Sequence, residues 1–190
     1  MTTLAPTLST RYFPRTAGWL RDLLLIVAGS LFVAALAQVR IPLPFTPVPI
    51  TGQTLGVLLV GAALGSKRGA SALSLYLAEG AIGFPFFQGG THGISIIFGA
   101  TGGYLIGFIV AAFIIGFLAE RGLERSIRTS ILPFLVGTAI IYLCGAGWLA
   151  ISSLGIQKAI LLGVLPFLVG DAIKITLAGL ILPAAWKLLQ

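Results

Sequence analysis

The amino-acid sequence predicts an all-α, polytopic membrane protein, with six transmembrane helices around an outward-facing pocket that is closed by a lid. The first observation is composition: of the 190 residues, 57% are hydrophobic and 9% are charged, and the mean hydropathy is +1.06. Soluble domains average about 25% charged residues. The second observation is that long apolar runs alternate with short basic or Pro/Gly-rich connections. The third is a pair of ionisable residues within one apolar run, Asp171 and Lys174.

A single membrane domain is expected over residues 1–190, with a cytoplasmic tail at 1–21 and a six-helix bundle at 22–188. The first 20 residues carry scattered Arg and Pro, without the compact apolar stretch of a cleaved signal peptide. Glycine is abundant, at 25 residues, which suits close helix packing in lipid. One cysteine, Cys144, excludes an intramolecular disulfide, and a single histidine leaves little material for a metal site.

Each of the six expected spans is predicted from an apolar run. A full crossing takes about 20 apolar residues. The third run is short and contains Glu79, whereas the sixth is long enough to kink at Pro166. Gly103 and Gly107, four residues apart in the fourth run, indicate close packing against a neighbouring helix. In chain order the expected spans are Leu23–Val39, Thr51–Gly65, Gly69–Ile82, Ala100–Leu118, Ile131–Ile151 and Ala159–Trp186.

Residues 40–53, RIPLPFTPVPITGQ, interrupt the helical pattern. Prolines at positions 42, 44, 47 and 49 remove backbone donors and exclude a regular helix, so this segment is expected to be extended. Its apolar side chains need cover, and we expect it to pack over the mouth of the bundle as a lid. The Gly- and aromatic-rich stretch 83–93, GFPFFQGGTHG, is a second expected loop.

The basic residues predict the orientation in the membrane, because cytoplasmic loops carry an excess of Lys and Arg. With six spans, both termini lie on one side. The opposite side carries only Arg40 and Lys158, so both termini are expected to be cytoplasmic and the pocket to open outward. The residues on the predicted cytoplasmic side are Arg11, Arg15, Arg21, Lys67, Arg68, Arg121, Arg125, Arg128 and Lys187.

Asp171 and Lys174 are the strongest clue to function. A charged side chain at the bilayer centre costs about 2.5–3.5 kcal/mol on the insertion scale, and such residues are functional candidates by default. Three residues apart on a helix, the two side chains share a face and partly neutralise each other. A carboxylate accepts hydrogen bonds and an ammonium donates them, so the pair suits a small ligand with both kinds of group. A structural ion pair between helices is the alternative.

Other residues leave alternatives open. Glu79 either faces the same pocket, pairs with a nearby cation or lies at the outer interface. His92 is either a proton relay or, as is commoner for a lone histidine in a polar loop, a solvated residue. The aromatic side chains of 83–93 and Tyr104 either line a small-molecule site, which is mostly apolar with a few polar groups, or simply pack. Gln88 offers both an amide donor and an acceptor.

The segment 41–61, IPLPFTPVPITGQTLGVLLVG, resembles the signature of the BioY family, the biotin-specific substrate-binding S-components of energy-coupling-factor transporters. Three similar motifs follow in the family's order. They are GFPFFQGG at 83–90, ATGGYLIGF at 100–108 and GDAIK at 170–174. The resemblance covers nearly the whole chain from residue 22 onward.

This resemblance implies a six-helix protein in the plasma membrane of a prokaryote that binds biotin with high affinity. It implies uptake together with a transmembrane coupling subunit and two cytoplasmic ATPases, and no cofactor, because biotin is the transported ligand. Asp171 and Lys174 match the family's polar contacts to biotin, and loops 41–51 and 84–90 match its pocket cover. The candidate substrate-binding residues are Asp171, Lys174, Gln88, Phe86, Tyr104, Thr46 and Val48.

Other classes of function are less favoured by the sequence. An intramembrane enzyme is not expected, because neither G-x-S-x-G nor H-E-x-x-H occurs. The chain also lacks G-x-x-x-x-G-K-[ST], so ATP-driven uptake needs partner subunits. The net charge of +7 is spread between apolar runs, which indicates a lipid bilayer rather than nucleic acid as its surroundings. A solo biotin transporter that works without the coupling subunit is the alternative function.

Overall fold

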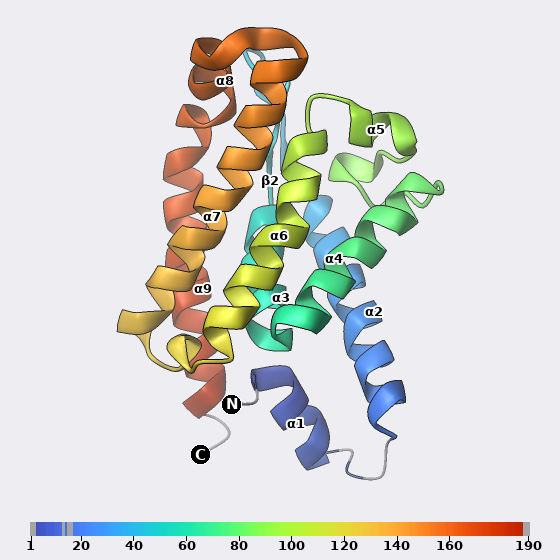
Figure 1. The fold of residues 1–190 in the computed structure, drawn as a ribbon, viewed down its shortest axis with the longest axis vertical. Helices are drawn as coiled ribbons and strands as arrows, with labels where there is room; N and C mark the ends of the chain where they lie inside the picture. Colours follow the sequence, from blue (N-terminus) through green and yellow to red (C-terminus); the bar gives the residue numbers. More distant parts are fainter. Residues whose placement is uncertain (1–2, 13, 15–16, 188–190) are drawn as a thin grey trace.

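The computed structural model describes residues 3–12, 14 and 17–187, which form a bundle of helices along one long axis (Figure 1). Helix α6 occupies the centre, because it packs against α7, α3 and α4. The helices are α1 Leu4–Tyr12, α2 Gly18–Ala37, α3 Gln53–Leu64, α4 Ser66–Ala81, α5 Ile94–Phe98, α6 Gly102–Ala119, α7 Ile127–Leu149, α8 Gly155–Gly163 and α9 Leu168–Lys187. Two short strands, β1 Arg40–Ile41 and β2 Ile50–Thr51, pair antiparallel, with Arg40 opposite Thr51.

The proline-rich segment contains no helix, as its composition predicts, but it is not extended throughout: residues 42–49 form the loop between β1 and β2, with a turn at Pro44 and Phe45 in which the Thr46 N–H donates to the Leu43 carbonyl over 3.4 Å. The segment that ends in β2 runs from the end of the bundle near α8 down to the N-terminus of α3 (Figure 1). Helix α3 has 12 residues, which is about 18 Å of helix at 1.5 Å per residue. Non-helical backbone at membrane depth is tolerated only where it is buried in protein or lines a cavity. The junction of β2 and α3 is therefore where a cavity is expected.

Close packing of α6 on α7 depends on glycine, as the spacing of Gly103 and Gly107 predicts. A Cβ added to Gly103 would lie 2.2 Å from Cβ of Trp148, and one added to Gly107 would lie 2.9 Å from Cβ of Cys144. The indole N–H of Trp148 donates to the carbonyl of Gly99 over 3.0 Å, which fixes the start of α6. These contacts hold one wall of the bundle together.

The N-terminal region, for which the sequence predicts a cytoplasmic tail, is largely helical in the described residues. Residues 4–12 form helix α1, in which Leu4 and Pro6 are buried, and α1 packs against α3, α2 and α9. Helix α2 begins at Gly18, inside the residues assigned to the tail, because the apolar run extends back through Trp19 and Leu20. Arg15, which was placed on the cytoplasmic side, lies outside the described residues.

Within the described part of the chain, four helical stretches are long and apolar enough to cross a membrane: Gly18–Ala37, Gly102–Ala119, Ile127–Ser152 and Gly155–Lys187. The last two are longer than single regular helices. A π-helical turn, Ala150–Leu154, separates α7 from α8, and a 3₁₀ turn at Leu165–Phe167 separates α8 from α9. The other two expected spans correspond to α3, which is short, and to α4, which has 16 residues and begins with a basic turn.

The ends of the bundle differ in charge. Helix α1, the α3–α4 junction, the α6–α7 connection and the last turn of α9 lie at one end (Figure 1). That end carries the basic residues Lys67, Arg68, Arg121, Arg125 and Lys187. The β1–β2 segment, α5 and α8 lie at the other end (Figure 1).

Candidate functional site

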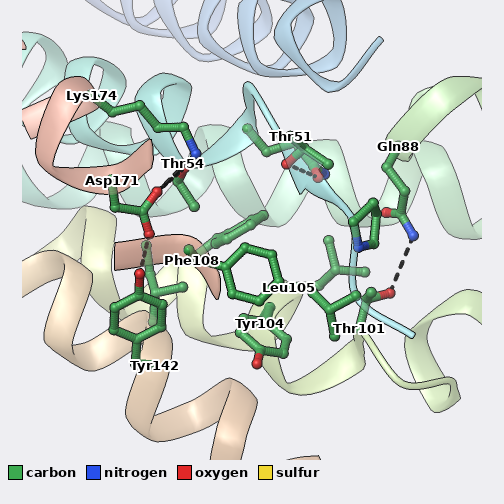
Figure 2. Close-up of a pocket in the computed structure, with 15 residues that line it drawn as sticks. Thr51, Thr54, Gln88, Thr101, Tyr104, Leu105, Phe108, Tyr142, Asp171 and Lys174 are labelled. Atoms are coloured by element: carbon green, nitrogen blue, oxygen red, sulfur yellow. Dashed lines mark hydrogen bonds and ion pairs between the residues drawn. The ribbon is translucent and has the colours of Figure 1, made fainter. Parts of the chain in front are cut away.

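A cavity lies at the N-terminus of α3, where α3, α6, α7 and α9 meet the segment that carries β2 (Figure 2). Its middle is apolar, and Figure 2 shows Leu105 and Phe108 between two polar groups of side chains. One group is ionic and the other consists of amides and hydroxyls. The lining residues are Val48, Pro49, Thr51, Gln53, Thr54, Gln88, Thr101, Tyr104, Leu105, Phe108, Ile141, Tyr142, Phe167, Asp171 and Lys174.

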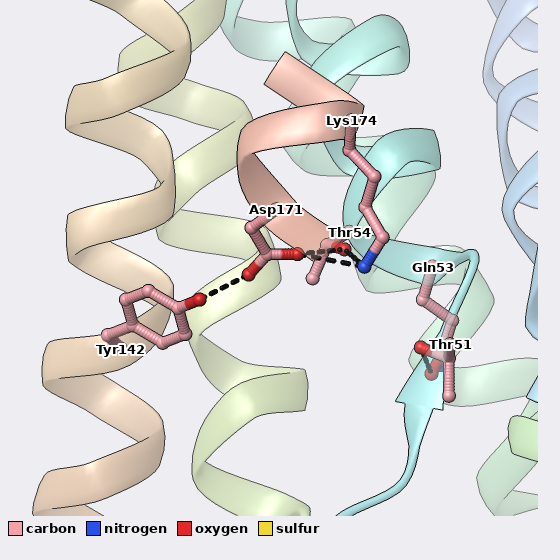
Figure 3. A network of polar contacts seen from close by, with 6 residues as sticks. All are labelled: Thr51, Gln53, Thr54, Tyr142, Asp171 and Lys174. Atoms are coloured by element: carbon pink, nitrogen blue, oxygen red, sulfur yellow. Dashed lines mark hydrogen bonds and ion pairs between the residues drawn. The ribbon is translucent and has the colours of Figure 1, made fainter. Parts of the chain in front are cut away.

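The ionic end is organised around Asp171, in the first turn of α9 (Figure 3). Its Oδ1 lies 2.8 Å from Nζ of Lys174 and accepts a hydrogen bond from the Thr54 hydroxyl over 3.2 Å. Lys174 Nζ also donates to the Thr54 hydroxyl over 2.7 Å. The hydroxyl of Tyr142 donates to the other carboxylate oxygen. Three helices, α3, α7 and α9, therefore meet at one carboxylate.

This arrangement keeps two charges out of bulk water. The exposed fraction of the side chain is 14% for Lys174 and 7% for Asp171. Burying an ion costs several kcal/mol even after relaxation, and attraction within a pair repays the cost only when the remaining donors and acceptors are also satisfied. Thr54 and Tyr142 supply that satisfaction for the carboxylate. The ammonium has three N–H donors, and two of them bond to Asp171 and Thr54 among the described residues.

The amide end is neutral. The Thr51 hydroxyl and the Gln53 amide oxygen lie 2.9 Å apart at the start of α3, and the Gln53 amide nitrogen donates to the Tyr76 hydroxyl over 2.6 Å. Across the cavity, the amide nitrogen of Gln88 lies 3.4 Å from the Thr101 hydroxyl (Figure 2). These groups offer both donors and acceptors to a neutral polar ligand group.

Of the predicted site residues, five line the cavity and two do not. Asp171, Lys174, Gln88, Tyr104 and Val48 line it. Tyr104 does so while its hydroxyl donates to the carbonyl of Gly163 over 2.6 Å.

Thr46 and Phe86 are not among the residues that line the cavity. The Thr46 hydroxyl donates to the carbonyl of Leu162 over 2.7 Å, which fastens the proline-rich segment to α8. Phe86 stacks on Phe84, with ring centroids 5.4 Å apart. Both lie in segments that border the cavity without being among its lining residues.

Glu79 and His92, for which the sequence allows several roles, lie away from the cavity. Glu79 accepts a hydrogen bond from the hydroxyl of Ser30, a fully buried residue on α2, so it joins α4 to α2 rather than facing the cavity. His92 is exposed in the loop before α5, which agrees with its interpretation as a solvated residue.

Sequence reasoning missed Thr54, Tyr142, Gln53 and Phe108. Thr54 lies 117 residues from its partner Asp171, and Tyr142 lies 29 residues away on another helix. No local spacing joins such residues. A polar residue within an apolar run is the one available signal, and Thr54, Gln53 and Tyr142 each have that character.

The space between the lining side chains is small, about 50 Å³. Typical small-molecule pockets hold about 300–1,000 Å³. At the junction of the proline-rich segment and α3 the lining is tightly packed, and Val48 is only 6% exposed.

The fold and this site define a class: a helical membrane protein with a cavity between its helices that is charged at one end. The chain belongs to the BioY family, whose model matches residues 5–190. This is a family of transport proteins rather than enzymes, as the sequence predicts.

Individual relatives and one solved structure are similar to this chain over most of its length. A biotin transporter BioY of Rhizobium etli is 38% identical over 138 residues, which cover 68% of this chain and 74% of the relative. One from Rhodobacter capsulatus is 45% identical over 129 residues, covering 66% and 67%. The crystal structure of an S-component for biotin from an ECF-type ABC transporter matches with a TM-score of 0.81 and 30% identity, over 90% of this chain and 95% of that chain.

Proposed function

We propose that this chain binds biotin and is the substrate-binding S-component of an energy-coupling-factor transporter. The observation that carries the proposal is the cavity, in which the buried pair Asp171 and Lys174 faces apolar walls and a neutral amide end. The relatives described above are biotin transporters, and the matching crystal structure is an S-component for biotin.

The chemistry of biotin supports this proposal. Biotin carries two polar groups, a cyclic urea and a carboxylate, separated by a thioether ring and an alkyl chain. The cavity has two polar ends separated by Leu105 and Phe108. Each end offers hydrogen-bonding groups to one polar group of the ligand, and the apolar middle suits the part between them. A site built this way rejects analogues that leave its buried polar groups unpaired.

We propose that the proline-rich segment, residues 42–49, is the lid of this pocket. A cavity of about 50 Å³ is too small for a ligand of biotin's size, so part of the wall must move to admit it. Prolines remove backbone donors from this segment, which leaves fewer hydrogen bonds to break on opening. The Thr46 hydroxyl, bonded to the carbonyl of Leu162, holds it in the closed position.

We propose that the bundle crosses the membrane six times, with α3 together with the β1–β2 segment making one crossing and α4 another. The basic end that carries α1 and the last turn of α9 is then cytoplasmic, as the positive-inside rule requires, and the cavity opens outward. Energy for uptake comes from a transmembrane coupling subunit and two ATPases, because this chain has no Walker A pattern.

A calorimetric titration of the purified protein with biotin tests the proposal, with biotin amide as a second ligand and Asp171→Asn and Lys174→Ala as variants. We expect tight, saturable binding by the parent protein and a large loss in both variants. An affinity for biotin amide equal to that for biotin excludes a strong contact to the carboxylate. Absence of binding by folded parent protein would overturn the biotin assignment.

Uptake of labelled biotin tests the partners. We expect uptake in cells that express this chain with the coupling subunit and the ATPases, and little uptake when those subunits are absent. Full uptake by this chain alone would instead establish a solo biotin transporter.

A further inference from the structure

We infer that Tyr76, a residue outside the cavity, is a positioning residue for both carboxamides of the amide end, Gln53 and Gln88. The inference rests on the proposed biotin-binding function and deepens it. Tyr76 lies on α4, and its side chain is fully buried, with 0% exposure. A buried hydroxyl is costly without a hydrogen-bond partner. The partner of Tyr76 is a residue that lines the cavity.

The hydroxyl of Tyr76 holds Gln53. The amide nitrogen of Gln53 donates to it over 2.6 Å, and the amide oxygen accepts from the Thr51 hydroxyl over 2.9 Å. The hydroxyls of Thr51 and Tyr76 can each donate or accept, so both hydrogen bonds form whichever way the oxygen and nitrogen of the carboxamide are assigned. Gln53 is 3% exposed. Its orientation is therefore fixed from both sides before a ligand arrives.

The ring of Tyr76 holds the turn that carries Gln88. Its centroid lies 5.6 Å from that of Phe87, with an interplanar angle of 79°, which is a favoured edge-to-face arrangement. Phe87 is fully buried against Gly80, where an added Cβ would lie 2.3 Å from the ring. Phe87 immediately precedes Gln88, and its carbonyl accepts from the N–H of Gly90 over 3.1 Å. Anchoring this ring therefore places the turn.

The carboxamide of Gln88 has a weaker hold of its own. Its contact to the Thr101 hydroxyl is long, at 3.4 Å, so its position depends mainly on the backbone turn. One buried tyrosine thus sets the position of two amides that reach the cavity from different segments. Groups held in place before binding spare the cost of ordering them when the ligand arrives, so Tyr76 raises affinity without contacting the ligand.

A double-mutant cycle tests the inference through Tyr76→Phe, Gln53→Ala and the combination of the two. Phenylalanine keeps the ring on Phe87 and removes only the hydroxyl. One hydrogen bond corresponds to a loss of about threefold to tenfold in affinity, and we expect that loss for biotin in Y76F. Because Tyr76 acts through Gln53, the double variant should bind no more weakly than Q53A. Additive losses, or parent affinity in Y76F, would overturn the inference.

Ser30→Ala is the matched control. It also removes a buried hydrogen bond to α4, the one between Ser30 and Glu79, which lies one helical turn from Tyr76 and away from the cavity. We expect S30A to lower the melting temperature while biotin affinity stays within about twofold. A loss of affinity in S30A equal to that in Y76F would assign both effects to general loosening of α4.

A second measurement separates this inference from the proposed function. Hydrogen exchange of the ligand-free protein reports on the turn at 87–91 and on the start of α3. We expect exchange at the start of α3 to be faster in Y76F than in the parent protein or S30A, and exchange at 87–91 to rise only when the ring is removed as well, in Tyr76→Leu. If the parent protein does not bind biotin, the proposed function fails and this comparison alone decides: unchanged exchange at the start of α3 in Y76F, or at 87–91 in Y76L, would overturn the positioning role.

Discussion

Asp171 and Glu124 are both buried carboxylates, and they differ in what surrounds them. Asp171 is 5% exposed and accepts hydrogen bonds from Tyr142, Thr54 and Lys174. Glu124, in the turn between α6 and α7, is 0% exposed, and neither carboxylate oxygen makes a well-aligned hydrogen bond to a described residue. Burial raises the pKa of Glu124 above its ordinary value, and the backbone N–H of Glu124, the charge of Arg125 and the indole N–H of Trp186 offset part of that effect.

The difference in hydrogen bonding distinguishes a carboxylate at the cavity wall from one buried in a packing contact between helices. At Asp171, three helices bring matched donors to one carboxylate, and the result is a polar group of fixed geometry inside a cavity. At Glu124, the carboxyl group is buried where the α6–α7 turn packs near the end of α9; the guanidinium of Arg125 lies 4.6 Å from the ring centroid of Trp186. Burial alone therefore does not distinguish the two carboxylates. Asp171 differs in that its carboxylate is fully paired and lines the cavity.

The largest effect is expected from removing the cation at the paired site. Lys174→Met leaves the Asp171 carboxylate buried with two hydroxyl donors and no counter-charge. Breaking one partner out of a buried pair typically costs about 3–5 kcal/mol. We expect a loss of that size in the free energy of unfolding, measured by denaturant titration in detergent, together with loss of biotin binding.

The double variant D171N/K174M tests whether pairing is the cause. Replacing a whole buried pair by uncharged groups is often neutral or stabilising, so we expect stability to recover toward that of the parent protein while binding stays lost. A double variant as unstable as K174M would show that packing of the lysine side chain, not the unpaired charge, is responsible.

A smaller effect on stability, of opposite sign, is expected from a substitution at Glu124. A raised pKa means that folded protein holds a proton on Glu124 more tightly than unfolded protein does. Stability from this group is therefore fully present below its ordinary pKa of about 4.3 and is lost as pH rises through the raised value. Glu124→Gln removes the charge, so we expect it to stabilise the protein by about 1–3 kcal/mol at pH 8 and by less at pH 5.

Thermal unfolding of the parent protein and E124Q at both pH values measures this effect. Glu120→Gln is a contrasting control, because Glu120 accepts hydrogen bonds from the backbone N–H and the hydroxyl of Ser66, over 2.7 and 2.8 Å. Weakening these hydrogen bonds in Glu120→Gln should destabilise the start of α4. A gain in E124Q that is equal at pH 5 and pH 8 would contradict a buried, proton-linked carboxyl group.

The sequence predicts one half of the paired site and misses the other. Asp171 and Lys174 lie three residues apart, so helical geometry alone places them on one face. Thr54 and Tyr142 reach them from α3 and α7, and no rule of spacing connects residues that far apart in the chain. Prolines predict that residues 42–49 are not helical, but the sequence does not indicate that they form the loop of a strand pair leading to a 12-residue α3.

The burial of Glu124 could not be predicted from the sequence for a related reason. Residues 119–130 form the most charged stretch of the chain, and a charged stretch predicts a solvated loop. Glu124 is nevertheless fully buried, because packing of the α6–α7 turn against neighbouring helices decides exposure there. Burial of one residue in a polar turn is a tertiary property, whereas the apolar runs and glycine spacing that predict α6 and α7 are local.

The smallest effect is expected from removing one of the three partners of Asp171. Tyr142→Phe deletes the hydroxyl that donates to this carboxylate and keeps the ring on the cavity wall. Since Thr54 and Lys174 still contact the carboxylate, we expect a loss of about threefold to tenfold in biotin affinity, well short of the loss in K174M, as measured by the same calorimetric titration. Tyr104→Phe is the comparison variant, because the Tyr104 hydroxyl donates to the backbone carbonyl of Gly163 rather than to Asp171.

If Y142F abolished binding as K174M does, the Tyr142 hydroxyl itself would contact the ligand, and Asp171 would no longer be the centre of the ionic end.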